Sequence, residues 1–108
     1  MMLGKSFIIL SFLLAACSTV QLGRDFDPAA FDARVQRGVT TQTEVRDWLG
    51  APSSVGVSVE SDGERFEKWT YYYGVGELPS MTNARIKILE IRFDPQYVVR
   101  AYTWSSGQ

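Results

Sequence analysis

Histidine is absent from the 108-residue sequence, and cysteine occurs once, as Cys17. The commonest general base and metal ligand is therefore missing, and no disulfide can form within the chain. The acidic residues are scattered over expected turns and outward strand faces, and Gly74-Val75-Gly76 lacks the rest of a phosphate-binding motif. We therefore predict that the chain is not an enzyme and holds no metal or cofactor.

Excess charge is also missing, because 11 Lys and Arg residues stand against 12 Asp and Glu residues. No polybasic segment is present, which argues against a nucleic-acid partner. The length is that of one domain with a modest core.

A long apolar segment is lacking too. Residues 7–14 form an apolar run after Lys5, but a transmembrane helix needs roughly 20 such residues. The order of positive charge, apolar run and small residues is typical of a secretory signal peptide. An uncleaved anchor helix or a buried core helix is the alternative.

The sequence Leu14-Ala15-Ala16-Cys17 resembles the lipobox of bacterial lipoproteins. The resemblance implies cleavage before Cys17 and covalent lipid on that cysteine, and Ser18 is similar to an outer-membrane sorting signal. We therefore expect residues 1–16 to be a signal peptide, 17–26 a lipidated tether and 27–108 a domain at the periplasmic face of the outer membrane. Without Lys5, Lys and Arg fall from 11 to 10, leaving a net charge of about −2.

Two short helices are predicted after the tether. Asp27 followed by Pro28 is typical of a helix start, with Phe31 and Val35 on one face and Gly38 as the expected left-handed end. Thr41 and Glu44 have the spacing of a capping box, with Thr40 as the alternative cap. Val45, Trp48 and Leu49 follow on one face, and Gly50-Ala51-Pro52 ends this second helix.

From residue 53 the apolar period changes to two, which predicts strands near residues 55–59, 65–73 and 85–93. Residues 98–104 form a further candidate strand, and residues 74–83 are expected to be a loop. We therefore predict an α+β fold in which two helices pack on one face of a small antiparallel sheet, in the order ααβββ or with a fourth strand. The expected core is Phe31, Val35, Val45, Trp48, Leu49, Trp69, Tyr71, Leu89, Ile91, Phe93 and Val99.

Three segments carry a further resemblance. Gly38-Val39-Thr40-Thr41 with Leu49-Gly50-Ala51-Pro52, then Trp69-Thr70-Tyr71, then Leu89-Glu90-Ile91-Arg92-Phe93-Asp94, resemble in order and spacing the SmpA/OmlA (BamE-like) lipoproteins. One departure is Tyr97, which stands where that family usually has Gly, so we expect a different hairpin geometry there.

The resemblance implies a lipid-anchored scaffold or adaptor, an accessory component in assembly of β-barrel outer-membrane proteins. Its implied partners are the membrane through the anchor, envelope proteins such as barrel-assembly subunits, and anionic lipid. The alternative is a stand-alone envelope lipoprotein that binds and inhibits an enzyme or maintains the envelope under stress. The sequence names neither the partner nor the oligomeric state.

Three parts of the chain are candidates for partner binding. Tyr72, Arg100, Tyr102 and Trp104 are expected on the sheet face opposite the core, and Tyr, Trp and Arg are common in interfaces; cross-strand pairing is the structural alternative. Thr40, Thr41 and Gln42, at a helix start, suit an anion such as a lipid phosphate, or simply cap the helix. The loop of residues 74–83, with Leu78 and Met81, is the third candidate.

Overall fold

The structure is a computed structural model that describes residues 18–107. Cys17 and the expected signal peptide lie outside the described residues. The elements, in chain order, are β1 (Thr19–Leu22), α2 (Pro28–Arg34), α3 (Gln42–Leu49), β2 (Ser54–Val59), β3 (Arg65–Glu77), β4 (Thr82–Phe93) and β5 (Val99–Gly107).

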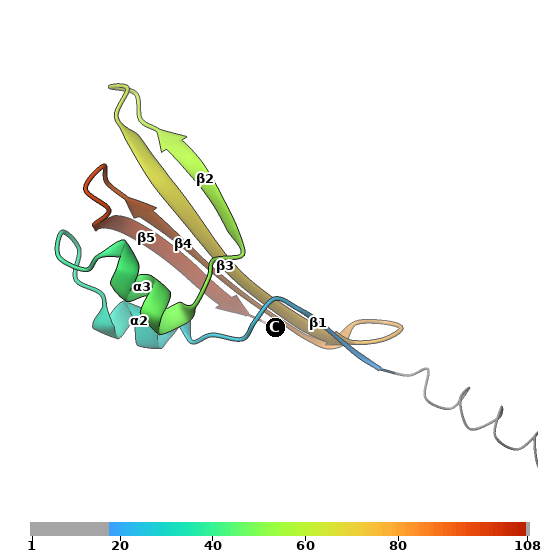
Figure 1. Cartoon of the computed structure of the whole chain (residues 1–108). Helices are drawn as coiled ribbons and strands as arrows, with labels where there is room; N and C mark the ends of the chain where they lie inside the picture. The colour runs from blue at the N-terminus through green and yellow to red at the C-terminus, as the bar shows by residue number, and fades with distance from the viewer. Residues whose placement is uncertain (1–17, 108) are drawn as a thin grey trace, which may run out of the picture.

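The predicted fold class is wrong, because the described chain is mainly one five-stranded antiparallel sheet with two short helices (Figure 1). The strand order is β1-β3-β4-β5, and β2 also pairs with β3. The long strand β3 has two partners along one edge, since residues 65–70 pair with β2 and residues 74–77 pair with β1. The sheet therefore extends well beyond the helices at both ends.

Two segments of the sheet were missed in the sequence. Residues 18–26 were expected to be a tether and residues 74–83 a loop, but β1 pairs with the end of β3, and β3 and β4 continue to Glu77 and Thr82. A four-residue strand and a glycine-containing one carry too weak a periodic signal to be recognised without their partners.

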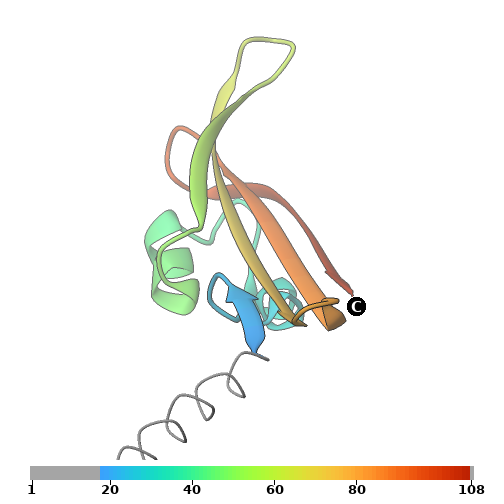
Figure 2. The same cartoon turned by 90° about the vertical axis from the view of Figure 1, so that its right-hand side faces the viewer.

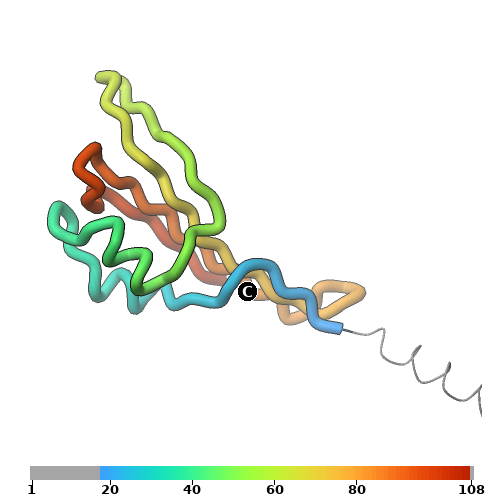
Figure 3. The backbone as a smooth tube through the Cα atoms, in the orientation of Figure 1, coloured from blue at the N-terminus to red at the C-terminus, as the bar shows by residue number. Residues whose placement is uncertain are grey.

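The turn between β3 and β4 lies beside the start of β1. The backbone N–H of Leu78 donates to the carbonyl oxygen of Ser18 at 3.1 Å. Figures 1 and 2 show β1 and this turn at one end of the molecule, while the hairpin between β2 and β3 protrudes at the opposite end (Figure 3).

The helix starts follow the predicted chemistry. The Asp27 carboxylate accepts from the N–H of Ala30 at 3.1 Å, and Thr41 and Glu44 form a complete capping box. The first helix, however, ends at Arg34 rather than near Gly38, because Val35 is already extended. Gly38 has a φ of 79° and its N–H donates to the carbonyl oxygen of Val99 at 2.7 Å, so it joins the helices to β5.

The predicted core is confirmed. Its fully buried members come from both helices and from β3, β4 and β5: Phe31, Val45, Trp69, Tyr71, Leu89, Ile91, Phe93 and Val99. Val35, Trp48 and Leu49 pack against them while partly buried, together with Phe26 and Tyr102. Because these side chains lie between the sheet and the helices, they define a helix side of the sheet and leave a bare side.

Tyr97 lies in the turn between β4 and β5 with a φ of 63°. This left-handed conformation favours glycine and is uncommon for a bulky residue. Hydrogen bonds within the turn hold it, since its N–H donates to the Asp94 carbonyl oxygen at 2.8 Å and its own carbonyl oxygen accepts from Gln42. The turn thus keeps a backbone shape that glycine would adopt without strain.

Candidate functional site

The start of α3 is occupied by internal contacts. Thr40 is buried, and its hydroxyl oxygen accepts from the N–H of Gln36 at 2.8 Å. The N–H groups of Gln42 and Glu44 donate to the Tyr97 carbonyl oxygen and the Thr41 hydroxyl. The Nε2 atom of Gln42 is buried and has no hydrogen-bond partner among the described residues. The backbone groups connect α3 to the turn between β4 and β5 and cap the helix, so they favour capping over the anion-site alternative.

The expected aromatic cluster on the bare side is divided between the two sides of the sheet. Tyr72 does lie on the bare side, whereas Tyr102 and Trp104 pair with Ile91 and Leu89 and therefore share the helix side. The cause is a bulge opposite Arg92 and Phe93, where Arg100 is the extra residue of β5. One extra residue reverses the alternation of all that follow, so this part of the prediction was wrong.

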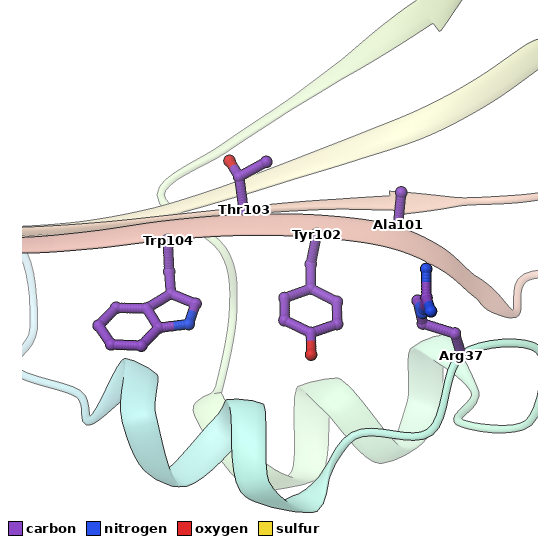
Figure 4. A pocket seen from close by; sticks show the side chains of 5 residues that line it. All are labelled: Arg37, Ala101, Tyr102, Thr103 and Trp104. Atoms are coloured by element: carbon purple, nitrogen blue, oxygen red, sulfur yellow. The ribbon is translucent and has the colours of Figure 1, made fainter.

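Tyr102 and Trp104 instead border an open groove along β5, which is lined also by Ala101, Thr103 and, from the segment after α2, Arg37. Figure 4 shows both rings pointing toward the helices and Arg37 beside them, while Ala101 and Thr103 point to the other side. The groove has a volume of about 510 Å³ and is wide open. Arg37 was not predicted as a site residue, because its place beside Tyr102 depends on the non-helical segment that follows α2.

Tyr102 is held in a fixed position within this groove. Its hydroxyl donates to the Asp32 carboxylate, and its ring meets Phe31 edge-on at 5.5 Å between centroids. The hydrogen bond to Asp32, with a smaller effect of burial, raises the pKa of Tyr102 above its usual value. A protonated, immobilised ring can contact a partner with little loss of side-chain freedom.

The groove runs along an edge of the sheet. β5 is the last strand in the strand order, and its start is covered because Val99 exchanges hydrogen bonds with Gly38 and Thr40. Beyond that point, within the described part of the chain, no strand pairs with the outer side of β5. An unpaired edge of this kind can accept an added strand from another chain.

The bare side of the sheet changes character along its length. Its residues in the middle of the sheet include Lys68, Glu90 and Arg92, and Arg92 forms an ion pair with Glu60. Toward the β1 end the next cross-strand row contains Tyr72 and Ile88, and the row after it contains Leu22, Gly74, Ile86 and Gly107. The polar surface thus becomes apolar within a few residues.

A hollow of about 300 Å³ lies in this apolar end, and among the described residues that line it none is charged. Gly74 contributes no side chain at its floor, between Leu22 of β1 and Ile86 of β4. Six larger side chains surround that floor: Val20, Leu22, Tyr72, Met81, Ile86 and Ile88. Leu22 and Ile86 remain 61% and 56% exposed.

One feature of the sequence indicates this hollow. Ile86 and Ile88 alternate with Arg85 and Lys87, just before Leu89 and Ile91 alternate in the opposite phase. Strand β4 is therefore apolar on one side at its start and on the other at its end.

Over residues 18–107 there is no group of three or more His, Cys, Asp or Glu side chains placed to hold a metal ion. The carboxylates of Asp25, Glu60 and Asp94 each lie within ion-pair distance of a basic side chain.

Within the same residues, no helix has the length and apolarity needed to cross a bilayer.

No protein-family model, curated protein sequence or solved structure matches this chain.

Proposed function

We propose that the protein is a lipid-anchored adaptor on the periplasmic face of the outer membrane, which binds other envelope proteins through the edge of β5. The anchor is proposed from Leu14-Ala15-Ala16-Cys17. The observation that carries the binding role is the groove in which Tyr102 and Trp104 lie beside Arg37, along an unpaired strand edge.

The composition of the groove supports a protein partner. Trp, Tyr and Arg are enriched among the residues that dominate interface energies, and Trp104 is 38% exposed here. A partner strand added to β5 would satisfy backbone groups along residues 100–107 while its side chains meet the two rings. The groove is open rather than enclosed, which suits a protein segment better than a small substrate.

We propose barrel-assembly subunits as the first partners to test. Their support is the sequence resemblance in the segments around Thr41, Trp69 and Phe93 alone, because the strand-rich fold differs from the predicted pair of helices on one face of a small sheet. No reaction is proposed, since a site with converging nucleophile, base and oxyanion donors has no counterpart in the contacts described above.

The test is co-purification from detergent-solubilised bacterial membranes. We expect Trp104→Ala to lower partner recovery at least tenfold, because truncating an aromatic anchor commonly costs about 2 kcal/mol or more. The matched control is Tyr97→Asn, which removes another exposed aromatic at a φ of 63° that Asn adopts readily.

Recovery of barrel-assembly subunits with the wild type and the control, but not with Trp104→Ala, would support the proposal. Equal recovery with both variants would remove β5 as the binding surface. Recovery of a single soluble enzyme, inhibited on binding, would favour the stand-alone alternative.

A further inference from the structure

We infer that the apolar end of the bare side of the sheet rests in the headgroup region of a phospholipid bilayer, directly beside the anchor. The inference depends on the proposed function, since it takes Cys17 to carry lipid. It adds a second membrane contact, made by folded protein, and fixes which surface of the domain faces the bilayer.

The residue that follows Cys17 lies at the apolar end of the sheet. Ser18 is hydrogen-bonded through its carbonyl oxygen to the turn between β3 and β4. Val20, which lines the hollow, is three residues after Cys17. Three residues span at most about 11 Å. A lipid on Cys17 therefore brings the membrane surface within reach of the hollow, with no long tether to separate them.

The polarity of the bare side changes along the strands. From Lys68 and Arg92 toward Ser18 come Thr70 and Glu90, then Tyr72 and Ile88, and finally Leu22 and Ile86; beyond Lys68, the ring of Phe66 lies against the Arg92 guanidinium. A bilayer presents the same sequence of environments, from water through the headgroups to hydrocarbon, and tyrosine is enriched at the boundary. The surface matches the bilayer in the direction that the anchor requires.

The two sides of β4 differ in chemistry at this end. Ile86 and Ile88 face the bare side, whereas Arg85 and Lys87 face the other side at the same depth. Lys87 is held there by Asp25, at 2.8 Å between Nζ and Oδ1. This end of the sheet is therefore amphipathic, with apolar side chains on the bare side and basic side chains on the other, the division that interfacial elements make between acyl chains and phosphates.

A bilayer also accounts for the exposure of these side chains better than solvent does. Leu22, Ile86, Met81 and Tyr72 are 61%, 56%, 44% and 45% exposed around one hollow. A contiguous apolar surface of this kind on a soluble domain marks a binding site for protein or membrane. Its position next to Ser18 selects the membrane.

The test uses the full-length protein expressed in bacteria, purified from membranes and reconstituted in vesicles of phosphatidylethanolamine and phosphatidylglycerol. Ile86→Trp places an indole at the hollow, and Val57→Trp is the matched control, since the two residues are 56% and 57% exposed in strands of the same sheet. Val57 pairs with Glu67 and Ile86 with Gly74, about 24 Å apart along β3 at ~3.4 Å per residue.

We expect acyl-brominated phospholipid to quench roughly half of the added emission of Ile86→Trp, since interfacial elements lie about 5–10 Å into the headgroup boundary. The added emission of Val57→Trp is expected to be unchanged. Flotation of the same vesicles reports whether the protein is anchored, and matching unfolding midpoints show that both variants are folded.

If both variants float with the vesicles and neither is quenched, the inference is overturned while the anchor stands. If neither floats, the anchor fails, and the proposed function and the inference fail with it. If the emission of Ile86→Trp is blue-shifted but insensitive to brominated lipid, the hollow is covered by protein, a second copy or another partner, and the inference is again overturned.

Discussion

The bare side of the sheet has two regions that share the same strands but differ in chemistry. In the middle of the sheet, Lys68, Glu90 and Arg92 face outward, which is the usual surface of a strand covered on its other side only. At the β1 end, Leu22, Ile86 and Ile88 face outward around the floor formed by Gly74. No helix covers either region. The lack of a covering helix therefore does not explain why the β1 end is apolar while the middle of the sheet is polar.

The difference shows that the apolar end was not needed to build the core. The core is complete without it, because Leu89, Ile91 and Phe93 are fully buried on the helix side of β4. A contiguous apolar surface that adds nothing to the core marks a site of contact with another molecule. Three measurements on the isolated protein test how far the two regions differ.

The largest effect is expected from truncating neighbouring residues of β4 that face opposite sides. Leu89 is 0% exposed and Ile88 is 39% exposed. Leu89→Ala should lower the free energy of unfolding by about 2–5 kcal/mol through lost burial and a cavity, and Ile88→Ala by about 1 kcal/mol. Urea unfolding measures both. Equal losses would make the apolar end a second core and remove the reason to seek a ligand for it.

A smaller effect is expected from Tyr71 at alkaline pH. Burial raises its pKa to about 12, and its hydroxyl donates to the Gly50 carbonyl oxygen at 2.8 Å. In the unfolded chain the phenol ionises near pH 10, so the stabilising effect is complete below that pH. It is lost as pH rises from about 10 toward 12, by roughly 1 kcal/mol at pH 11.

Tyr71→Phe should reduce this alkaline decline, leaving the part that the raised pKa of Tyr102 contributes, and should cost about 1 kcal/mol at neutral pH, where the hydrogen bond is lost. Tyr72→Phe is the control, because it removes an exposed hydroxyl from the adjacent residue on the bare side. The measurement is the unfolding midpoint from pH 8 to 11. If the midpoint of Tyr71→Phe falls as much as that of the wild type, the decline in stability belongs to other groups.

The smallest effect is expected from two glycines, one in each half of the sheet. A Cβ on Gly74 or on Gly56 would meet nothing within 4 Å, and glycine within a strand is unfavourable by roughly 0.5–1 kcal/mol. Gly74→Val and Gly56→Val should therefore both raise the unfolding midpoint by a similar small amount. A loss of stability at Gly74 alone would mean that its floor position is strained, and that the hollow is required by the fold.

How much of this was readable from the sequence depended on whether local or distant contacts decide the structure. The capping box of Thr41 and Glu44 and the alternation through Leu89, Ile91 and Phe93 are local patterns, and both were predicted. The orientation of Tyr102 toward the helix side was not predicted, because the bulge at Arg100 forms only when β4 and β5 pair. The strand β1 was missed for the same reason, since its partner lies more than fifty residues away in β3.

The hollow was missed for a different reason. Glycine at position 74 indicates a loop when the chain is considered alone, but here it sits in a strand with a neighbour on both sides. At this position the lack of a side chain forms the floor of the hollow, and it does not serve to give the backbone conformational freedom.

The pairing of β1 also has a mechanical consequence. Thr19–Leu22 runs antiparallel to β3, so tension applied at Ser18 acts along the axis of β1. The hydrogen bonds between antiparallel strands lie perpendicular to that axis, and they are loaded together in shear rather than broken one after another. A domain held in this way would move as a rigid body with the point from which Ser18 is pulled.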